Sequence, residues 1–201
     1  MQNATPLVGE LPRPDAWTPD TQSPEVQRTL ADAAPDTPTQ AAAMWKQALR
    51  EGAVSGSVAS VLSTCVLLAV GNRQAGSTVA PLNAASHWLW GDESLRAQEP
   101  SLRHTLTGYL TQHAASVFWA TLYAGAYGHR DEAKAWPQAV AGGIATSAVA
   151  YLVDYKVVPK RLTPGYEHRI SGPAMLATYA ALAAGFALGA RALARRGRSL
   201  S

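Results

Sequence analysis

The charged residues of this chain are separated by long gaps. No Asp, Glu, Lys or Arg occurs in the windows 52–72, 104–129, 135–153 and 170–190. Each window is close to the about 20 residues that a helix needs to cross a hydrocarbon core of roughly 30 Å. A helix at the surface of a water-soluble domain would instead place charges along one face every three or four residues. The gaps therefore predict an all-α fold, an integral membrane four-helix bundle.

Residues that flank the gaps define the ends of the predicted spans. Pro137 and Pro173 suit the first turn of a helix, where a missing N–H costs no hydrogen bond. Trp45 and Lys46 precede the first gap, and such residues are typical of headgroup depth. The third span is mostly Ala and Gly, so its insertion depends most on its neighbours. The expected spans are about 52–72, 104–128, 137–158 and 172–191.

The uncharged stretch 74–91 is a poor span because Pro81 lies near its middle. It ends with Trp88 and Trp90, side chains that favour the membrane interface. We expect a short helix at about 81–90 that lies in the interface. The alternative is a re-entrant element that is buried against the bundle.

The N-terminal segment 1–40 differs in composition from the rest of the chain. It contains seven of the 13 prolines and few large apolar residues. Such a segment cannot bury enough surface to offset its chain entropy, so we expect a disordered tail. It lacks a basic region followed by an apolar one, so it is not expected to be a secretory signal. The remaining residues, 41–201, are expected to form one membrane domain.

Charge and cysteine content bound the compartment and the partners. The net charge is +3, without a stripe of Arg, Lys and aromatic residues, so no nucleic-acid partner is expected. The single cysteine, Cys65, excludes a disulfide within the chain. Four spans put both termini on one side, and the compact basic cluster at the C-terminus favours the cytoplasmic side. We therefore expect a multi-pass protein of the bacterial inner membrane.

Small residues recur at four-residue intervals within the predicted spans. Lipid gives helices no hydrophobic reason to associate, so close packing at small residues takes over. The glycines that fit this pattern are Gly52 and Gly56 in the first span, Gly143 in the third, and Gly185 and Gly189 in the fourth. The preferred interpretation is helix–helix seams within one chain; the alternative is the seam of a homodimer.

Polar groups inside predicted spans are candidates for function, because they are costly in lipid. His113 ranks first, on a helix face with Tyr109 and Ser116 and bordered by Gln112. Tyr151 and Asp154 recur at similar spacing on the third span. The preferred interpretation gives His113 a hydrogen bond across a seam. The alternatives are a proton relay, a polar ligand pocket, or a haem or metal site, with His87 as a second ligand if segment 81–90 dips inward.

Cations are concentrated in the loop that follows Asp154. Lys156 and Lys160 suggest an ion pair with Asp154 at headgroup level. The candidate lipid-phosphate rim consists of Lys156, Lys160, Arg161 and Arg169. The alternative, which is preferred, is a solvated loop that sets the topology.

Three motifs resemble small multi-span inner-membrane proteins of proteobacteria. They are PLNAASHWLWGDE at 81–93, RHTLTGYLTQHAASVFWA at 103–120 and VDYKVVPKRLTPGYEHRIS at 153–171. The resemblance covers about 55–195. It implies a location and an architecture, and it assigns no activity to any residue.

The expected role is that of a structural or accessory membrane subunit without its own catalysis or cofactor. The Walker lysine motif, GxSxG and HExxH are absent from the sequence. Its expected partners are the lipid bilayer and either another membrane protein or further copies of the chain. The alternatives are a haem-binding, metal-binding or redox protein that uses His113, and an oligomeric channel or carrier lined by Tyr109, His113 and Ser116.

Overall fold

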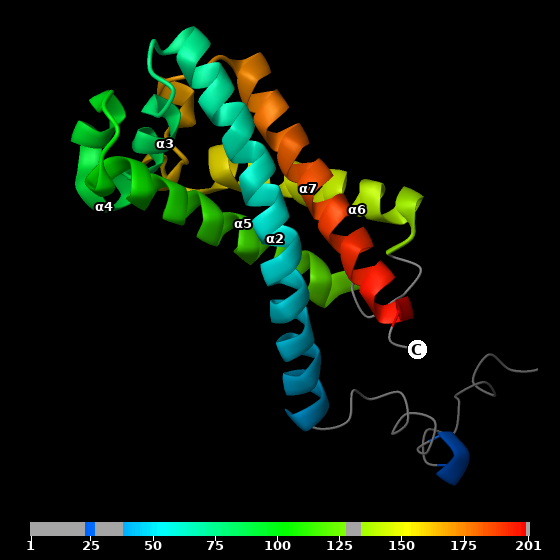
Figure 1. Cartoon of the computed structure of the whole chain (residues 1–201). Coiled ribbons are helices and arrows are strands. Elements are labelled where there is room, and N and C mark those ends of the chain that lie inside the picture. Colours follow the sequence, from blue (N-terminus) through cyan, green and yellow to red (C-terminus); the bar gives the residue numbers. More distant parts are fainter. Residues whose placement is uncertain (1–22, 27–37, 128–133, 200–201) are drawn as a thin grey trace, which may run out of the picture. The chain divides into compact units, whose positions relative to one another are not determined.

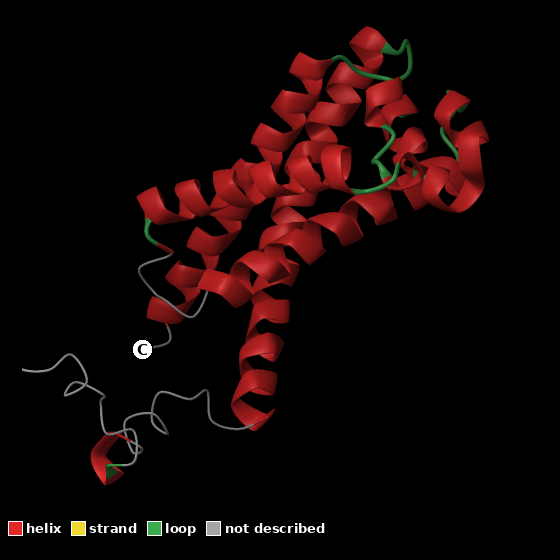
Figure 2. Cartoon of the chain, turned by 180° about the vertical axis from the view of Figure 1, so that it is seen from behind, coloured by secondary structure: helices red, strands yellow, loops and turns green. Residues whose placement is uncertain are grey.

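The computed structural model describes residues 23–26, 38–127 and 134–199. The chain divides into two units, Met1–Ala41 and Ala42–Ser201. The predicted disordered tail, 1–40, lies mostly outside the described residues, so it stays a prediction. Every regular element in the described part of the second unit is helical, which confirms the all-α fold (Figure 2).

Four long helices form the framework of the described domain. They are α2 (Pro38–Gln74), α5 (Thr107–Tyr127), α6 (Trp136–Leu152) and α7 (Gly172–Ser199) (Figure 1). Each contains one of the predicted spans in whole or in large part. The largest difference between an observed helix and its predicted span is at the start of α2. This helix begins ahead of the first charge gap because its Ala and Gln residues also favour a helix.

Short elements fill the two longer connections. Between α2 and α5 lie α3 (Ala80–Ala85), α4 (His87–Trp90), the 3₁₀ helix η2 (Gly91–Arg96) and the π-helical turn η3 (Leu102–Leu106). Between α6 and α7 lie the π-helical turn η5 (Val153–Val157) and the 3₁₀ turns η6 (Lys160–Leu162) and η7 (Tyr166–His168).

The long helices pack through their small residues. A methyl group at Gly56 of α2 would lie 2.5 Å from the Val117 Cα of α5. On α7, Gly185 and Gly189 press against Ala59 and Ser55 of α2. These contacts set α2 and α7 side by side and antiparallel, while α5 and α6 run across them (Figure 1). The repeated glycines thus form seams within one chain, as the preferred interpretation expected.

The segment at 80–90 is buried against the bundle over most of its length. All six residues of α3 and the following Ser86 and His87 are buried. Gly108 of α5 makes this possible, because a side chain there would collide with the Leu82 carbonyl. Only Trp88, Leu89 and Trp90 face outward. Most of this segment therefore packs against the bundle, and its placement at the membrane interface, or as a re-entrant element, stays a prediction.

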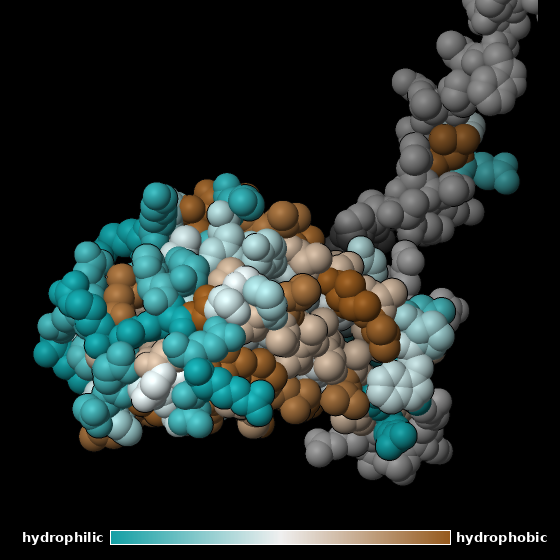
Figure 3. Space-filling view, turned by 90° about the horizontal axis from the view of Figure 1, so that it is seen from above, coloured by the Kyte–Doolittle hydropathy of each residue, from teal (hydrophilic) through white to brown (hydrophobic). Residues whose placement is uncertain are grey.

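The interior of the described domain combines many Ala and Ser residues with a few large apolar side chains, and further large apolar side chains are exposed. Its bulkiest fully buried side chains include five serines beside Phe186 and Leu67. Exposed apolar side chains occur on each long helix, among them Val61, Phe118, Ile144 and Leu176. Figure 3 shows apolar side chains over the middle of one face and hydrophilic ones gathered at one end.

Two helices have the length and composition of a membrane span, α2 over Gln40–Gln74 and α7 over Gly172–Arg195. The other two predicted spans do not reach that standard. α6 has 17 residues, the short end of the range of about 17–25 that crosses a bilayer. α5 contains Gln112, His113 and Ser116, which lower its hydropathy. The helical bundle is therefore established, and the number of spans remains a prediction.

Candidate functional site

A small chamber lies where α2, α5 and α7 converge with α3, α4 and the 153–171 connection. Its volume is about 50 Å³. By the same measure a water needs about 10–15 Å³, so the chamber has room for a few non-hydrogen atoms. Its polar and aromatic lining residues are Ser63, Trp88, Thr111, Gln112, Ser116, Trp119, Asp154, Tyr166, Thr178 and Tyr179.

One wall of the chamber is a chain of hydrogen bonds centred on Gln112. The Tyr166 hydroxyl donates to Gln112 Oε1, and Gln112 Nε2 donates to Ser63 Oγ at 2.8 Å. Ser63 in turn donates to the Ala59 carbonyl at 2.8 Å. Burial raises the pKa of the Tyr166 phenol above its usual range, so this hydroxyl stays a neutral donor. The chain ties α2, α5 and η7 together.

Asp154 is the one carboxyl group of the lining. The Tyr179 hydroxyl donates to Asp154 Oδ2 at 2.6 Å. Tyr179 is held in place by an edge contact with Tyr151, with ring centroids 5.3 Å apart. Within the described residues, no Lys or Arg forms an ion pair with Asp154. The predicted pairing with Lys156 and Lys160 is therefore replaced by a phenol–carboxylate contact, because both lysines point outward.

The turn that carries Tyr166 is anchored on α3 and α4. Trp88 Nε1 donates to the Thr163 carbonyl at 2.9 Å. Gly165 has a φ of +84°, and a methyl group there would lie 2.8 Å from the Ala84 carbonyl oxygen. Only glycine adopts this backbone without strain and allows this approach. The Thr163–Pro164–Gly165 turn therefore inserts Tyr166 into the bundle.

The structure separates the residues that the sequence grouped around His113. Ser116 and Asp154 line the chamber. Tyr109 and His113 do not; their rings lie 5.8 Å apart on a neighbouring face of α5. Among the described residues His113 Nδ1 has no hydrogen-bond partner, so the expected bond across a seam is not formed by this atom. Tyr151 packs in the aromatic cluster beside Tyr179.

The histidines do not form a metal site in the described part of the chain. His87 is buried, and its Nδ1 contacts the Ala84 carbonyl at 2.8 Å. No group of three His, Cys, Asp or Glu side chains among the described residues is placed to hold a metal ion. The alternative of a haem or metal bound through His113 and His87 stays a prediction.

The four cations of the predicted rim differ in environment. Lys156, Lys160 and Arg161 are exposed. Arg169 is half-buried, and its guanidinium donates to the Ala97 carbonyl at 3.3 Å. Arg169 therefore braces the turn against the η2 connection, and only the other three are free to meet lipid phosphates.

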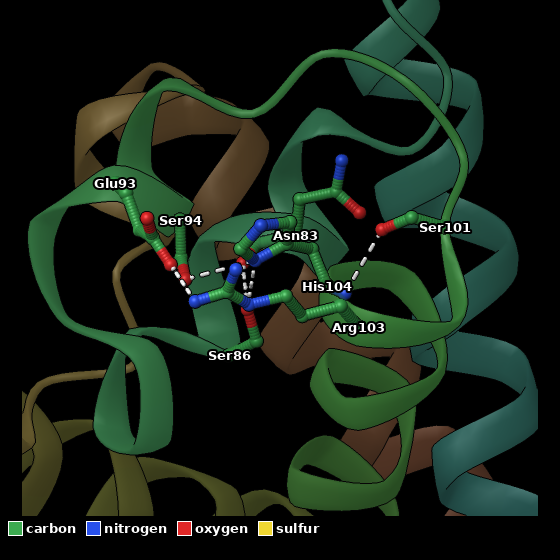
Figure 4. Close-up of polar contacts among 7 residues, drawn as sticks. All are labelled: Asn83, Ser86, Glu93, Ser94, Ser101, Arg103 and His104. Atoms are coloured by element: carbon green, nitrogen blue, oxygen red, sulfur yellow. Dashed lines mark hydrogen bonds and ion pairs between the residues drawn. The ribbon is translucent and has the colours of Figure 1, made fainter.

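A second polar cluster surrounds His104 in η3, the turn just before α5 (Figure 4). Its Nδ1 lies 3.1 Å from Ser94 Oγ and 3.3 Å from Ser86 Oγ. Beside it, the Asn83 amide donates to the carbonyls of Ala97 and Glu99. Ser86 and Ser94 are completely buried, so neither hydroxyl is accessible to a substrate. The cluster fastens the η2 connection to α3 and α5.

Sequence reasoning missed several lining residues of the chamber. Gln112 was placed at the border of the polar stripe, whereas it is the centre of the hydrogen-bond chain. Tyr166 and Tyr179 lie 54 and 67 positions beyond it. The Thr163–Pro164–Gly165 turn was the only local signal, and it marks a turn without showing where the turn docks.

Comparisons with protein-family models, with curated proteins and with solved structures found no match. The resemblance to proteobacterial inner-membrane proteins therefore stays a prediction, and the function rests on the geometry alone.

Proposed function

We propose that this chain is an integral membrane protein whose outer surface faces lipid and whose four long helices, α2, α5, α6 and α7, cross the bilayer. The observation that carries the proposal is the distribution of side chains: Ala and Ser make up much of the interior, and large apolar side chains are exposed on every long helix. Exposed apolar surface of this kind marks a face that lipid or a partner covers. In lipid it is the expected arrangement, since small residues permit close packing and exposed apolar groups cost nothing.

Tryptophans near both ends of α5 support a crossing by this helix as well. Near its start the Arg103 guanidinium lies 4.9 Å from the centre of the Trp90 ring. Near its end, Gly125 contacts the Trp45 ring of α2. A second cation–tryptophan pair joins α7 to α6, where the Arg191 guanidinium lies 5.6 Å from the centre of the Trp136 ring. Tryptophans and cations are the residues that prefer headgroup depth.

Within this membrane setting, we propose a structural or accessory role in the bacterial inner membrane, with both termini in the cytoplasm. The support is the character of the interior, in which the buried polar groups mostly pair with one another. The Gln112 chain, the Asp154–Tyr179 contact and the His104 cluster each join elements that are distant in sequence. Such contacts hold a bundle in one arrangement, which a subunit that docks on a partner requires.

Membrane extraction and reporter fusions test this proposal. We expect the full chain to stay in the pellet after washing with alkaline carbonate and to dissolve only in detergent. Reporters fused after Ser201 and at the N-terminus should both report the cytoplasm, and a reporter inserted at Gln98 should report the opposite side. Release by carbonate, or a cytoplasmic report from Gln98, would overturn the proposal.

A further inference from the structure

The chamber has the chemistry of a site for a small cation. Asp154 is the one ionisable carboxyl among its lining residues, and the lining contains no Lys, Arg or His. Its Oδ2 accepts the Tyr179 hydrogen bond, and none of the described residues donates to its Oδ1. A carboxylate has about four acceptor positions, so this group retains capacity toward the cavity.

The other polar side chains around the cavity are already engaged. Tyr166, Gln112 and Ser63 form one continuous chain of hydrogen bonds. The hydroxyls of Ser116 and Thr178 donate to carbonyls of their own helices, at 2.8 and 3.0 Å. A Mg²⁺ or Ca²⁺ ion would need about six oxygen ligands, which this set does not offer. The free capacity is concentrated on one carboxylate.

The remaining walls are aromatic. Trp88, Trp119, Tyr166 and Tyr179 come from four different elements and line one cavity. Aromatic rings attract organic cations through their quadrupole, and a carboxylate next to such rings supplies the counter-charge. Trp88 is 40% exposed and also lines the cavity.

We propose that this chamber binds a small ammonium ion, either ammonium itself or methylammonium, with Asp154 as its counter-ion. The cavity volume of about 50 Å³ admits a ligand of a few non-hydrogen atoms. An N–H of the ligand donates to Asp154, and its charge faces the aromatic walls. This site does not depend on how many helices cross the membrane.

Direct binding to the full chain in detergent tests the proposal. The probe is radiolabelled methylammonium in equilibrium dialysis, at constant ionic strength set with choline chloride, and tryptophan fluorescence provides a second readout. We expect saturable binding that unlabelled ammonium displaces at least about tenfold more effectively than sodium or potassium. Absence of saturable binding, or equal displacement by sodium, would overturn the assignment.

Variants locate the site. Asp154→Asn keeps an acceptor for Tyr179 and removes the charge, so we expect methylammonium affinity to fall at least about tenfold. Glu93→Gln removes an exposed carboxylate that pairs with Arg103 outside the chamber, and it should bind like the unaltered protein. Trp119→Leu should weaken binding about threefold or more, and it provides the test if Asp154→Asn does not fold. Unchanged affinity in a folded Asp154→Asn or Trp119→Leu variant would place the ligand elsewhere.

Discussion

Gln112 is the residue on which the candidate site depends most. It accepts from Tyr166 and donates to Ser63, so it joins a loop and two helices by side chains alone. His113, one position further, was the sequence candidate, yet its Nδ1 has no partner among the described residues. One residue turns a helix by about 100°, so a polar stripe read from sequence is easily centred one position away.

Replacement of Gln112 by leucine should destabilise the bundle. The substitution removes both hydrogen bonds and leaves the buried Tyr166 hydroxyl without its acceptor, which costs about 1–3 kcal/mol. The free energy of unfolding in an SDS titration of detergent-solubilised protein measures the effect. Gln138→Leu, at an exposed position of α6, is the matched control and should change it little.

A double-mutant cycle with Tyr166 separates the Gln112–Tyr166 hydrogen bond from the general packing of the two side chains. If the two side chains act through one hydrogen bond, the cost of Gln112→Leu with Tyr166→Phe is smaller than the sum of the single costs. Strict additivity of the two substitutions would contradict the assigned bond.

At the scale of elements, glycines decide how closely the helices approach. Gly189 faces Ser55, and a methyl group added there would lie 2.9 Å from the Ser55 Cβ. Gly189→Ala should therefore lower the free energy of unfolding by about 1–3 kcal/mol, although alanine is the better helix former. Gly172→Ala, at the start of the same helix, meets no atom within 4 Å and should be neutral or stabilising. Equal effects at both positions would contradict the α2–α7 seam.

The turn that inserts Tyr166 gives a second prediction at this scale. Gly165 and Gly91 both have positive φ, +84° and +72°, but only Gly165 is crowded by neighbouring atoms. Alanine at either site costs about 1–3 kcal/mol of backbone strain, and at Gly165 it also meets the Ala84 carbonyl. We expect Gly165→Ala to increase protease cleavage within 159–171, while Gly91→Ala leaves it unchanged. Similar cleavage in both variants would mean that the turn is not docked on α3.

At the scale of the whole molecule, substitutions on the exposed apolar faces of the long helices show whether two or four helices span the membrane. Arginine at the centre of a lipid-facing helix costs about 2.5–3.5 kcal/mol of insertion free energy. Val61→Arg on α2 should therefore impair insertion under either topology. Phe118→Arg on α5 and Ile144→Arg on α6 should impair it only if these helices also contact hydrocarbon. All three positions are about half exposed, so burial does not separate them.

The readout is the fraction of protein that is retained in carbonate-washed membranes. Leu102→Arg, at an exposed position just before α5, is the control and should insert normally. Normal insertion of both the Phe118 and the Ile144 variants would show that only α2 and α7 span the membrane.

The sequence by itself determined where the helices lie. Charge gaps, prolines at helix starts and glycines at four-residue spacing are local signals, and α5, α6 and α7 begin within three residues of the predicted span starts. It also predicted that the seams lie within one chain. A charge gap reflects the solvent around one helix, and a repeat of small residues reflects which face of that helix packs. Both signals lie within a single segment of the sequence.

Only the tertiary structure decided what lies inside. Three features depend on residues that are far apart in the chain. They are the burial of α3, the hydrogen bond between Tyr166 and Gln112, and the contact between Asp154 and Tyr179. Such contacts arise from how crossing helices leave space at their centre, and no local periodicity encodes that space. The charge gaps thus established the framework, and the packing of small residues within it created the chamber.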